Sequence, residues 1–580
     1  MSTARLCRPA WGGISLAVVV FALLWILNAP YRQVYQPGHD DVTALADGSL
    51  LLPQAHWPAW FTRGHSDFFD TYPEWAQHDT AFARPVFQFV IYLAHFLFGV
   101  DWSSYLVINY ASIAGVASIA FAIARTALGL GTGASVLAAV LTLLSSAVLE
   151  FSVGVLGAAS ECLASILVGC GFLAVIARRD VLCVLLLLLA LLTKETAAWA
   201  PLAASLTVLL RPPGDRLSGR RAIVAAGMLL PLAAWLGIRF GFFDGVGGTY
   251  ATADYMPISA FLKLSALKLR HFHHLFVAQV MAASEWQWPV VDRTIRIGAA
   301  LLVILLLTPW VLSSFRIASD LLGRAWRERS LPTVDARFLV TLWAAMALVF
   351  YFALALSSPR YAASAVMFAW PAVVGEVARR RSVILRAGLT ACLAISLVQT
   401  SHRLANSNPP AEESSEGRFF RAAGAMSVAL REVPPSAQQV YVLSAGGLVP
   451  ANAEYLQALL GMRAKIIRIV DAAWECRAEG SRVVVVHGVV DGTVTLTATL
   501  PDCARFFFAF SGIDARGLVD GQIRRNASIV YEFPDARAVS PAPGIELGRR
   551  MTVRIRPGGS ARFIIEKGGT DGGITWFDTP

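Results

Sequence analysis

The sequence is dominated by apolar stretches long enough to cross a lipid bilayer, and this leaves few fold classes open. A spanning segment must satisfy its own backbone polar groups, so stretches of this length predict helices. About eleven of them occur before residue 401, at about 12–28, 105–124, 133–150, 157–177, 181–194, 196–210, 220–240, 295–315, 335–356, 362–377 and 383–400. We therefore predict a polytopic α-helical membrane protein.

The composition excludes an ordinary soluble protein, because 56% of the 580 residues are hydrophobic and only 15% are charged. The net charge of +10 invites a nucleic-acid interpretation. However, the basic residues form short clusters between the apolar stretches instead of gathering on one domain. They are typical of topology signals, and no nucleic-acid partner is expected.

A further apolar stretch, Phe87 to Val100, decides the topology. If it does not cross, nearly every basic cluster is cytoplasmic, as the positive-inside rule requires. These clusters are Arg5 and Arg8, Arg125, Arg178 and Arg179, Arg211 to Arg221, Arg316 to Arg329, and Arg379 to Arg381. We therefore expect Phe87 to Val100 to lie along the outer interface beside Trp102. We expect the protein to lie in the cell inner membrane with its N-terminus in the cytoplasm. Large outer loops are then predicted at about 30–104 and 241–294.

After the last span the pattern changes to a polar linker, 401–417, and then to an extracytoplasmic domain, 418–580. Alternating apolar residues predict an α/β or mostly β fold for it. The predicted strands are Val440 to Leu443, Ile466 to Val470, Val483 to Val486, Val494 to Thr499 and Phe506 to Phe510, and the predicted helix is Ala453 to Leu460.

Charged residues against the hydrocarbon core are costly and by default indicate function. The expected topology places several on the outer face. Asp40 and Asp41 follow the first span by about ten residues, and such a pair suits a general base, a divalent-cation ligand or simply a solvated turn. No cofactor is firmly predicted, although a divalent cation is compatible with this pair.

Three more sites share that face. Arg84 opens the interfacial helix, Lys194 and Glu195 stand between two spans, and Arg360 precedes Tyr361 at another junction. Each of the last two sites also has a non-functional interpretation. Lys194 and Glu195 could simply neutralise each other or mark a helix end by snorkelling. Arg360 and Tyr361 could anchor a helix end among the lipid headgroups.

Two weaker candidates complete the set. Glu161 stands near the outer start of the fourth span. His271, His273 and His274 lie on an amphipathic stretch, where an interfacial helix face is favoured over metal binding.

Together these residues place carboxylates beside several cations at the lipid boundary. This layout suits the binding of an anionic lipid headgroup and the activation of a neighbouring hydroxyl. Nucleotide sugars are not expected outside the cell, so a sugar donor used here would be linked to a lipid.

The order of these motifs resembles the GT-C superfamily of membrane glycosyltransferases, which includes protein O-mannosyltransferases and the lipid A aminoarabinose transferase. The resemblance is carried by Asp40-Asp41, by Phe82-Ala83-Arg84-Pro85-Val86, by the segment Leu191 to Thr196 and by Arg360-Tyr361, and it covers most of residues 1–400. It does not extend to the C-terminal domain.

The resemblance implies a polyprenyl-phosphate sugar donor and an unknown acceptor, which is a lipid, a glycan or a protein. Asp40 would be the base, with the division of roles between Asp40 and Asp41 left open because Asp-Glu is the commoner pair. Arg84, Lys194 and Arg360 would hold the donor phosphate, and the configuration at the sugar would invert. A non-enzymatic binder or transporter of lipid-linked saccharide is the alternative, since it needs the cations and not the base.

The topology is testable with reporters fused along the chain. Reporters after Arg179, Arg221 and Arg329 should give a cytoplasmic signal, and those after Asp79, Gly248 and Ser401 an outer signal, because the basic clusters stay inside. An outer signal at Arg221 would contradict the arrangement.

A disulfide is predicted between Cys476 and Cys503, because an oxidising compartment favours it; two separate thiols are the alternative. It would close a loop of about 27 residues and contribute about 3 kcal/mol to stability. Non-reducing peptide mapping of the exported protein should recover the linked peptides, whereas two free thiols would exclude the bridge.

Overall fold

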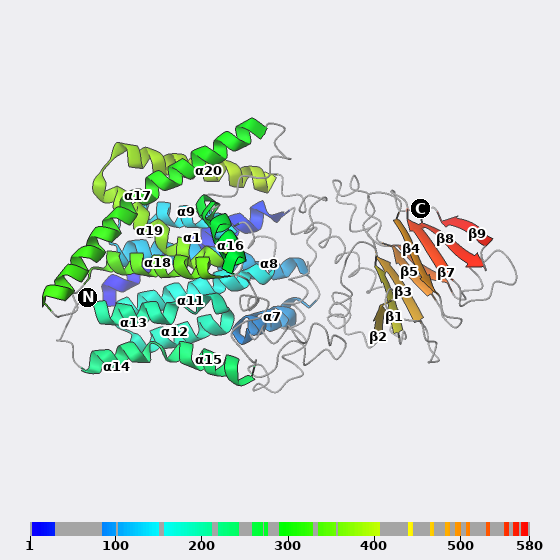
Figure 1. Ribbon diagram of the computed structural model, residues 1–580, viewed down its shortest axis with the longest axis horizontal. Coiled ribbons are helices and arrows are strands. Elements are labelled where there is room, and N and C mark those ends of the chain that lie inside the picture. The colour runs from blue at the N-terminus through cyan, green and yellow to red at the C-terminus, as the bar shows by residue number, and fades with distance from the viewer. Residues whose placement is uncertain are drawn as a thin grey trace. The chain divides into compact units, whose positions relative to one another are not determined.

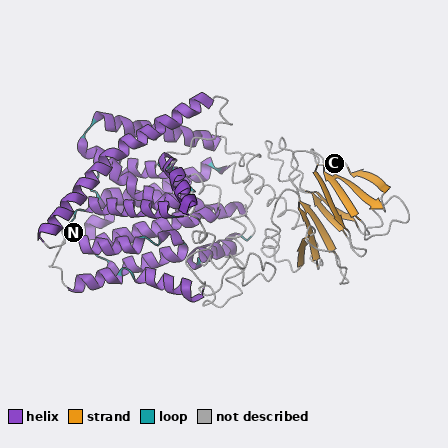
Figure 2. Ribbon diagram, viewed as in Figure 1, coloured by secondary structure: helices purple, strands orange, loops and turns teal. Residues whose placement is uncertain are grey.

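The computed structural model describes two sets of residues in the 580-residue chain. The helical set covers residues 3–29, 84–99, 102–149, 156–211, 219–242, 258–270, 272–276, 289–328, 334–354 and 358–405. The second set consists of strands between residues 439 and 577. The chain divides into two compact units, one containing Leu106–Asn406 and the other Ser407–Pro580. Figure 2 shows the described residues of Leu106–Asn406 as helices and those of Ser407–Pro580 as strands.

Figure 1 shows the helices of the described residues. They are α1 (Thr3–Leu27), α7 (Pro85–Phe98), α8 (Trp102–Ala122), α9 (Thr132–Leu143), α10 (Ser146–Leu149), α11 (Ala159–Ile176), α12 (Asp180–Thr193), α13 (Ala200–Leu210), α14 (Gly219–Gly227), α15 (Leu230–Phe242), α16 (Ile258–Arg270), α17 (Pro289–Glu328), α18 (Ala336–Ala353), α19 (Ala363–Arg380) and α20 (Val383–Ala405). Short turns of other helix types are η3 (Ile123–Ala127), η4 (Leu156–Ala158), η5 (Glu195–Ala197), η7 (Phe272–Leu275) and η8 (Pro359–Ala362).

Each predicted span overlaps a helix of the described residues. The length and composition of these helices are those of a multi-pass membrane protein. Seven helical segments in the described residues are long and apolar enough to cross a membrane: Ser103–Ala127, Leu156–Ile176, Gly219–Gly241, Ile297–Leu321, Ala336–Ala353, Pro359–Arg380 and Val383–Ser401. Apolar helices of 10–17 residues cover Gly12–Leu27, Pro85–Phe98, Thr132–Leu143, Asp180–Thr193 and Glu195–Leu210. The total of eleven spans and their orientation stay predictions.

Helix α19 forms the centre of the helical unit. All its side chains from Ala365 to Val377 are buried, which is the pattern of a helix surrounded by other helices. It packs against α9, α11, α17 and α18. A helix placed in this way holds both of its ends in position against the rest of the bundle.

Aromatic side chains from neighbouring helices fill the core beside α19. Phe172, Trp199, Trp343 and Phe368 form edge-to-face contacts with ring centroids 5.1–6.4 Å apart. The indole of Trp343 donates a hydrogen bond to the Thr207 hydroxyl at 2.8 Å. The buried indole is therefore satisfied as well as packed.

Two glycines let α8 and α11 approach closely. A Cβ on Gly115 would lie 2.4 Å from Cδ1 of Ile166, and a Cβ on Gly169 would lie 2.3 Å from Cγ2 of Ile119. Small residues at such crossings allow tight van der Waals packing between membrane helices. The first turn of α11 is thereby fixed relative to α8.

Several helices differ from the predicted boundaries, and the predicted span 133–150 is divided between α9 and α10. The predicted span 220–240 contains a turn at Met228–Leu229 that separates α14 from α15, although the residues of this turn are apolar. The predicted span 295–315 lies inside the 40-residue α17. Helix α20 continues through Ala405, five residues into the predicted linker.

The strands of the second unit form two sheets. They are β1 (Gln439–Ser444), β2 (Lys465–Arg468), β3 (Arg482–His487), β4 (Val494–Thr499), β5 (Phe506–Phe510), β6 (Ile529–Phe533), β7 (Arg550–Ile555), β8 (Ala561–Lys567) and β9 (Thr570–Phe577). One sheet has the order β2-β1-β3-β5-β6, and all its pairs are parallel except β5–β6. The other has the order β4-β7-β8-β9 and is antiparallel.

The first five strands occur where the sequence predicts them, with small shifts at their ends. The valine run of β3 is typical of parallel strands, which are covered on both faces. The four strands from β6 onward have no counterpart in the sequence prediction. The predicted helix Ala453 to Leu460 and most of the linker lie outside the described residues.

Candidate functional site

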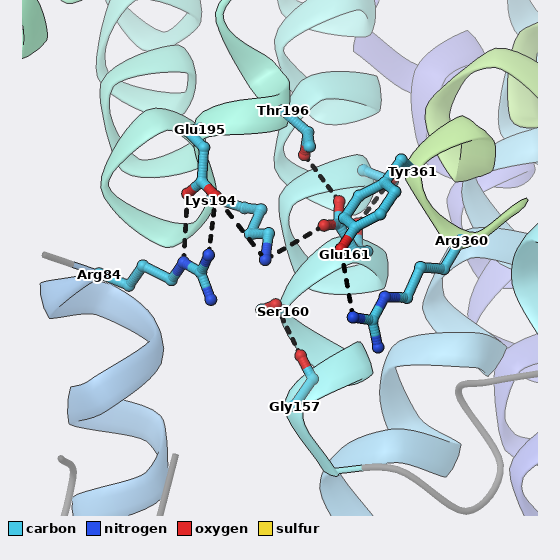
Figure 3. A network of polar contacts seen from close by, with 10 residues as sticks. Arg84, Gly157, Ser160, Glu161, Lys194, Glu195, Thr196, Arg360 and Tyr361 are labelled. Carbon is cyan, nitrogen blue, oxygen red and sulfur yellow. Dashed lines mark hydrogen bonds and ion pairs between the residues drawn. The ribbon is translucent and has the colours of Figure 1, made fainter. Parts of the chain in front are cut away.

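Six of the residues singled out from the sequence lie together at helix ends of the first unit. Arg84 immediately precedes α7, and Glu161 stands in the first turn of α11. Lys194 and Glu195 occupy the break between α12 and α13, and Arg360 and Tyr361 lie in the short η8. Four segments that are distant in the sequence therefore contribute to one polar cluster (Figure 3).

The local sequence explains why the chain breaks at these points. Lys194 adopts an extended conformation, with φ −160° and ψ 132°, which ends α12 and redirects the chain into η5. Pro201 stands in the first turn of α13, where its missing N–H has no helical partner to lose. Pro359 similarly begins η8. These breaks turn the charged side chains toward one another.

Arg84 and Glu195 form a two-point ion pair. The Arg84 Nη2 lies 2.7 Å from Glu195 Oε1, and its Nε donates to Glu195 Oε2 at 3.1 Å. Both side chains are mostly buried. The planar guanidinium is therefore held in one orientation by the carboxylate, which a lysine at position 84 would not achieve.

Lys194 and Glu161 form the most deeply buried ion pair of the cluster. Their side chains are 3% and 4% exposed, and Lys194 Nζ lies 3.3 Å from Glu161 Oε1. Thr196 donates a hydrogen bond from its hydroxyl to Glu161 Oε2 at 2.7 Å. Lys194 Nζ also lies 3.8 Å from Glu195 Oε1, so the lysine connects the two carboxylates.

Tyr361 separates the remaining cation from Lys194. Arg360 donates from Nη2 to the Tyr361 hydroxyl at 3.2 Å, and its guanidinium stands 5.2 Å from the centre of the same ring. Lys194 Nζ is 5.8 Å from that ring centre. Tyr361 thus keeps two like charges apart while making a cation–π contact with each.

Among the described residues, the cations of the cluster outnumber its carboxylates. Arg84, Lys194 and Arg360 are three cations, and Glu161 and Glu195 are two carboxylates. Cations gathered against a lipid environment suit an anionic ligand.

A fourth cation, Arg239, was missed in the sequence. Its side chain is 3% exposed on α15, and it stands 5.8 Å from the centre of the Trp235 ring. It lies within electrostatic range of Glu195 and Arg84. In the sequence, Arg239 is recognisable only as a single arginine near the end of an apolar stretch. An arginine that merely anchors a helix end gives the same pattern.

The side chains of the other candidate residues named from the sequence are not among those that the structure describes. Asp40, Asp41, Cys476 and Cys503 lie outside the described residues, as do His271 and the side chains of His273 and His274. In the described ranges, no group of three or more His, Cys, Asp or Glu side chains gathers in a way that could hold a metal ion. The cluster described above is thus built from ion pairs.

The fold and this cluster define a multi-pass helical protein with a cation-rich site at its helix ends. No protein-family model and no curated protein matches the chain. Among solved structures, it is similar to the apo oligosaccharyltransferase of Archaeoglobus fulgidus, with 12% identity and a TM-score of 0.39 over 78% of this chain and 64% of that chain. It is also similar to ArnT from Cupriavidus metallidurans bound to undecaprenyl phosphate, with 14% identity and a TM-score of 0.39 over 79% of this chain and 86% of that chain.

These values describe a distant likeness. The chain spans less than two thirds of the archaeal protein's length.

The Arg84–Glu195 pair should show measurable coupling. A double-mutant cycle with Arg84→Gln and Glu195→Gln, followed by denaturant unfolding in detergent, should give a coupling of about 1–3 kcal/mol, because each single change leaves a mostly buried charge without its partner. The Arg211–Asp180 pair, joined at 2.7 Å at the other end of α12, serves as the reference. If the changes in unfolding free energy from Arg84→Gln and Glu195→Gln simply added in the double mutant, the ion pair described here would be contradicted.

Proposed function

We propose that this chain is a membrane glycosyltransferase that moves a sugar from a polyprenyl-phosphate donor to an acceptor on the outer face of the cell inner membrane. One observation carries the proposal. Arg84, Lys194 and Arg360 come from three separate segments and belong to one buried cluster that also contains Glu161, Glu195 and Tyr361. The GT-C resemblance of the sequence assigns the same three cations to the donor phosphate.

The geometry supports phosphate binding in preference to a purely structural role. Four cations, counting Arg239, meet among the described residues of this cluster, and such a set of donors suits an anionic ligand. Glu195 holds the Arg84 guanidinium rigid, so little side-chain freedom is lost when an oxygen of the ligand binds. A guanidinium has five N–H donors and can contact a phosphate while paired to a carboxylate.

The proposed reaction is a direct displacement. The Asp40 carboxylate takes the proton of the acceptor hydroxyl, and the acceptor oxygen forms a bond to the anomeric carbon. The bond from that carbon to the phosphate oxygen breaks, and the polyprenyl phosphate leaves with the electron pair. The charge that develops on the leaving oxygen is stabilised by Lys194, Arg84 and Arg360. A phosphate leaves readily as an anion, so a general acid is not required, and the anomeric configuration inverts.

Two roles are open to Asp41 in this scheme. It either shares proton transfer with Asp40 or holds a divalent cation beside the phosphate. Glu161 and Glu195 are positioning residues, because they orient Lys194 and Arg84. Tyr361 orients Arg360 in the same way.

The other candidate function is a binder or transporter of lipid-linked saccharide without chemistry. It would use the same cations, and the cluster as described serves it equally well. The acidic pair separates the two functions, because only an enzyme needs Asp40 as a base.

Transfer should depend on Asp40 and on the cations in different ways. Asp40→Asn removes the proton acceptor and should lower turnover roughly 100-fold or more while donor binding stays close to normal. Lys194→Ala and Arg84→Ala should weaken donor binding as well as turnover, because a phosphate contact acts in the ground state and in the transition state. The measurements are transfer from a polyprenyl-phosphate sugar and binding of that donor by the purified protein.

Asp180→Asn provides the matched control. It breaks an ion pair of the same kind, with Arg211, at the far end of α12, and it should leave donor binding unchanged. Near-normal transfer by both Asp40→Asn and Asp41→Asn would exclude the acidic pair from the mechanism and favour the binder.

A further inference from the structure

Lys268 is a buried cation that the proposed reaction does not use. It belongs to α16, and its side chain is 3% exposed. Its ammonium donates hydrogen bonds to the carbonyl oxygens of Tyr351, at 2.7 Å, and of Leu354, and it lies 3.5 Å from the carbonyl oxygen of Phe352. The centre of the Tyr351 ring is 4.8 Å away, so the lysine also makes a cation–π contact.

These contacts cap the end of α18. The last carbonyl groups of a helix lack helical partners and carry the negative end of the helix dipole, so a cation beside them stabilises the helix end. A lysine in the last turn commonly does this for its own helix. Here the cation comes from α16 instead, and the cap of α18 therefore fastens one helix to the other.

The η7 turn that follows α16 is fastened to the bundle as well. The Phe272 ring stacks on Phe352 with centroids 6.0 Å apart, and the buried Phe276 ring meets Trp370 edge to face at 5.7 Å. Trp370 donates its indole N–H to the Ser145 hydroxyl at 2.9 Å, and the Phe276 carbonyl oxygen lies 3.3 Å from the same hydroxyl. The α16–η7 segment, residues 258–270 and 272–276, is therefore attached to α18, to α19 and to the turn before α10.

This segment lies beside η8, the turn that carries Arg360. Both η7 and α18 pack against η8. Leu354, whose carbonyl oxygen Lys268 holds, precedes the first residue of η8 by five positions. Two contacts thus lead from Lys268 to the turn that places Arg360, one through the end of α18 and the other through η7.

We propose that Lys268 is a positioning residue for Arg360. By capping α18 it keeps the α16–η7 segment docked, and the docked segment holds η8 in the conformation that presents Arg360 to the donor phosphate. This role rests on the proposed function, which gives Arg360 a phosphate to contact. When the segment is released, only a fraction of the molecules have Arg360 in place, and the apparent affinity for the phosphate falls in proportion to that fraction.

The test is the binding of undecaprenyl phosphate, a carrier lipid without a sugar, to the purified full-length protein in detergent. Lys268→Met keeps an unbranched side chain but removes the N–H donors, and it should weaken this binding about fivefold, because fewer molecules have the segment docked. Lys268→Arg keeps a cation with several N–H donors and should retain most of the affinity. Lys263→Met is the matched control, since Lys263 is exposed on the same helix, and it should bind as the wild type does.

Arg360→Gln separates a positioning role from a general loss of stability. In that background Lys268→Met should weaken the binding no further, because the side chain that Lys268 positions is already missing. A change that only loosened the whole bundle would lower the affinity by the same factor in both backgrounds. Equal losses with and without Arg360 would therefore overturn the proposal.

Hydrogen exchange followed by mass spectrometry gives a readout that needs no ligand. Lys268→Met should speed exchange of the backbone amides of the α16–η7 segment while α11 keeps its protection, and the milder Phe272→Leu should do the same. Unchanged exchange, or faster exchange with unchanged binding of undecaprenyl phosphate, would overturn the role of Lys268 and leave the proposed function standing. Normal binding by Arg360→Gln itself would overturn the phosphate contact of Arg360 in the proposed function, and this role with it.

Discussion

The buried ion pair between Lys194 and Glu161 is the contact on which the arrangement of the helix ends depends. Either charge alone at this depth would cost several kcal/mol, so the end of α12 and the start of α11 must meet. Glu195 follows Lys194 and brings Arg84 with it. The Tyr361 ring stands between Lys194 and Arg360, which adds the start of α19. Four segments of the chain therefore converge around this pair.

The sequence identifies the members of this cluster better than their partnerships. Arg84, Lys194 and Arg360 are recognisable because a charge beside an apolar stretch is costly and therefore rarely accidental. Glu161 looked weaker than the others, yet it is the buried partner of Lys194. Arg239 was missed because a lone arginine near a helix end has the same pattern as an anchor. Partnerships depend on which helix ends meet, and a linear pattern does not contain that information.

The fold shows the same division between local and tertiary information. Helices coincide with the predicted spans because apolar composition and length determine them directly. The turn between α14 and α15 is invisible in composition, since its residues remain apolar. In the second unit the uninterrupted valines of β3 predict a strand, whereas β6 to β9 lie among glycines, prolines and charges that obscure alternation. Sheet order depends on contacts between distant strands, which periodicity does not reveal.

The length of α12 has a consequence for the surrounding lipid. Its 14 residues span about 21 Å, and the hydrocarbon core of a bilayer is about 30 Å thick. Ion pairs mark both of its ends, Asp180–Arg211 at one and Lys194–Glu195 at the other, so neither end can be drawn further into hydrocarbon without cost. If α12 crosses the membrane as its apolar residues predict, the resulting hydrophobic mismatch is relieved when the bilayer thins locally beside it. Headgroups next to the polar cluster then stand closer to the membrane midplane than headgroups elsewhere in the same leaflet.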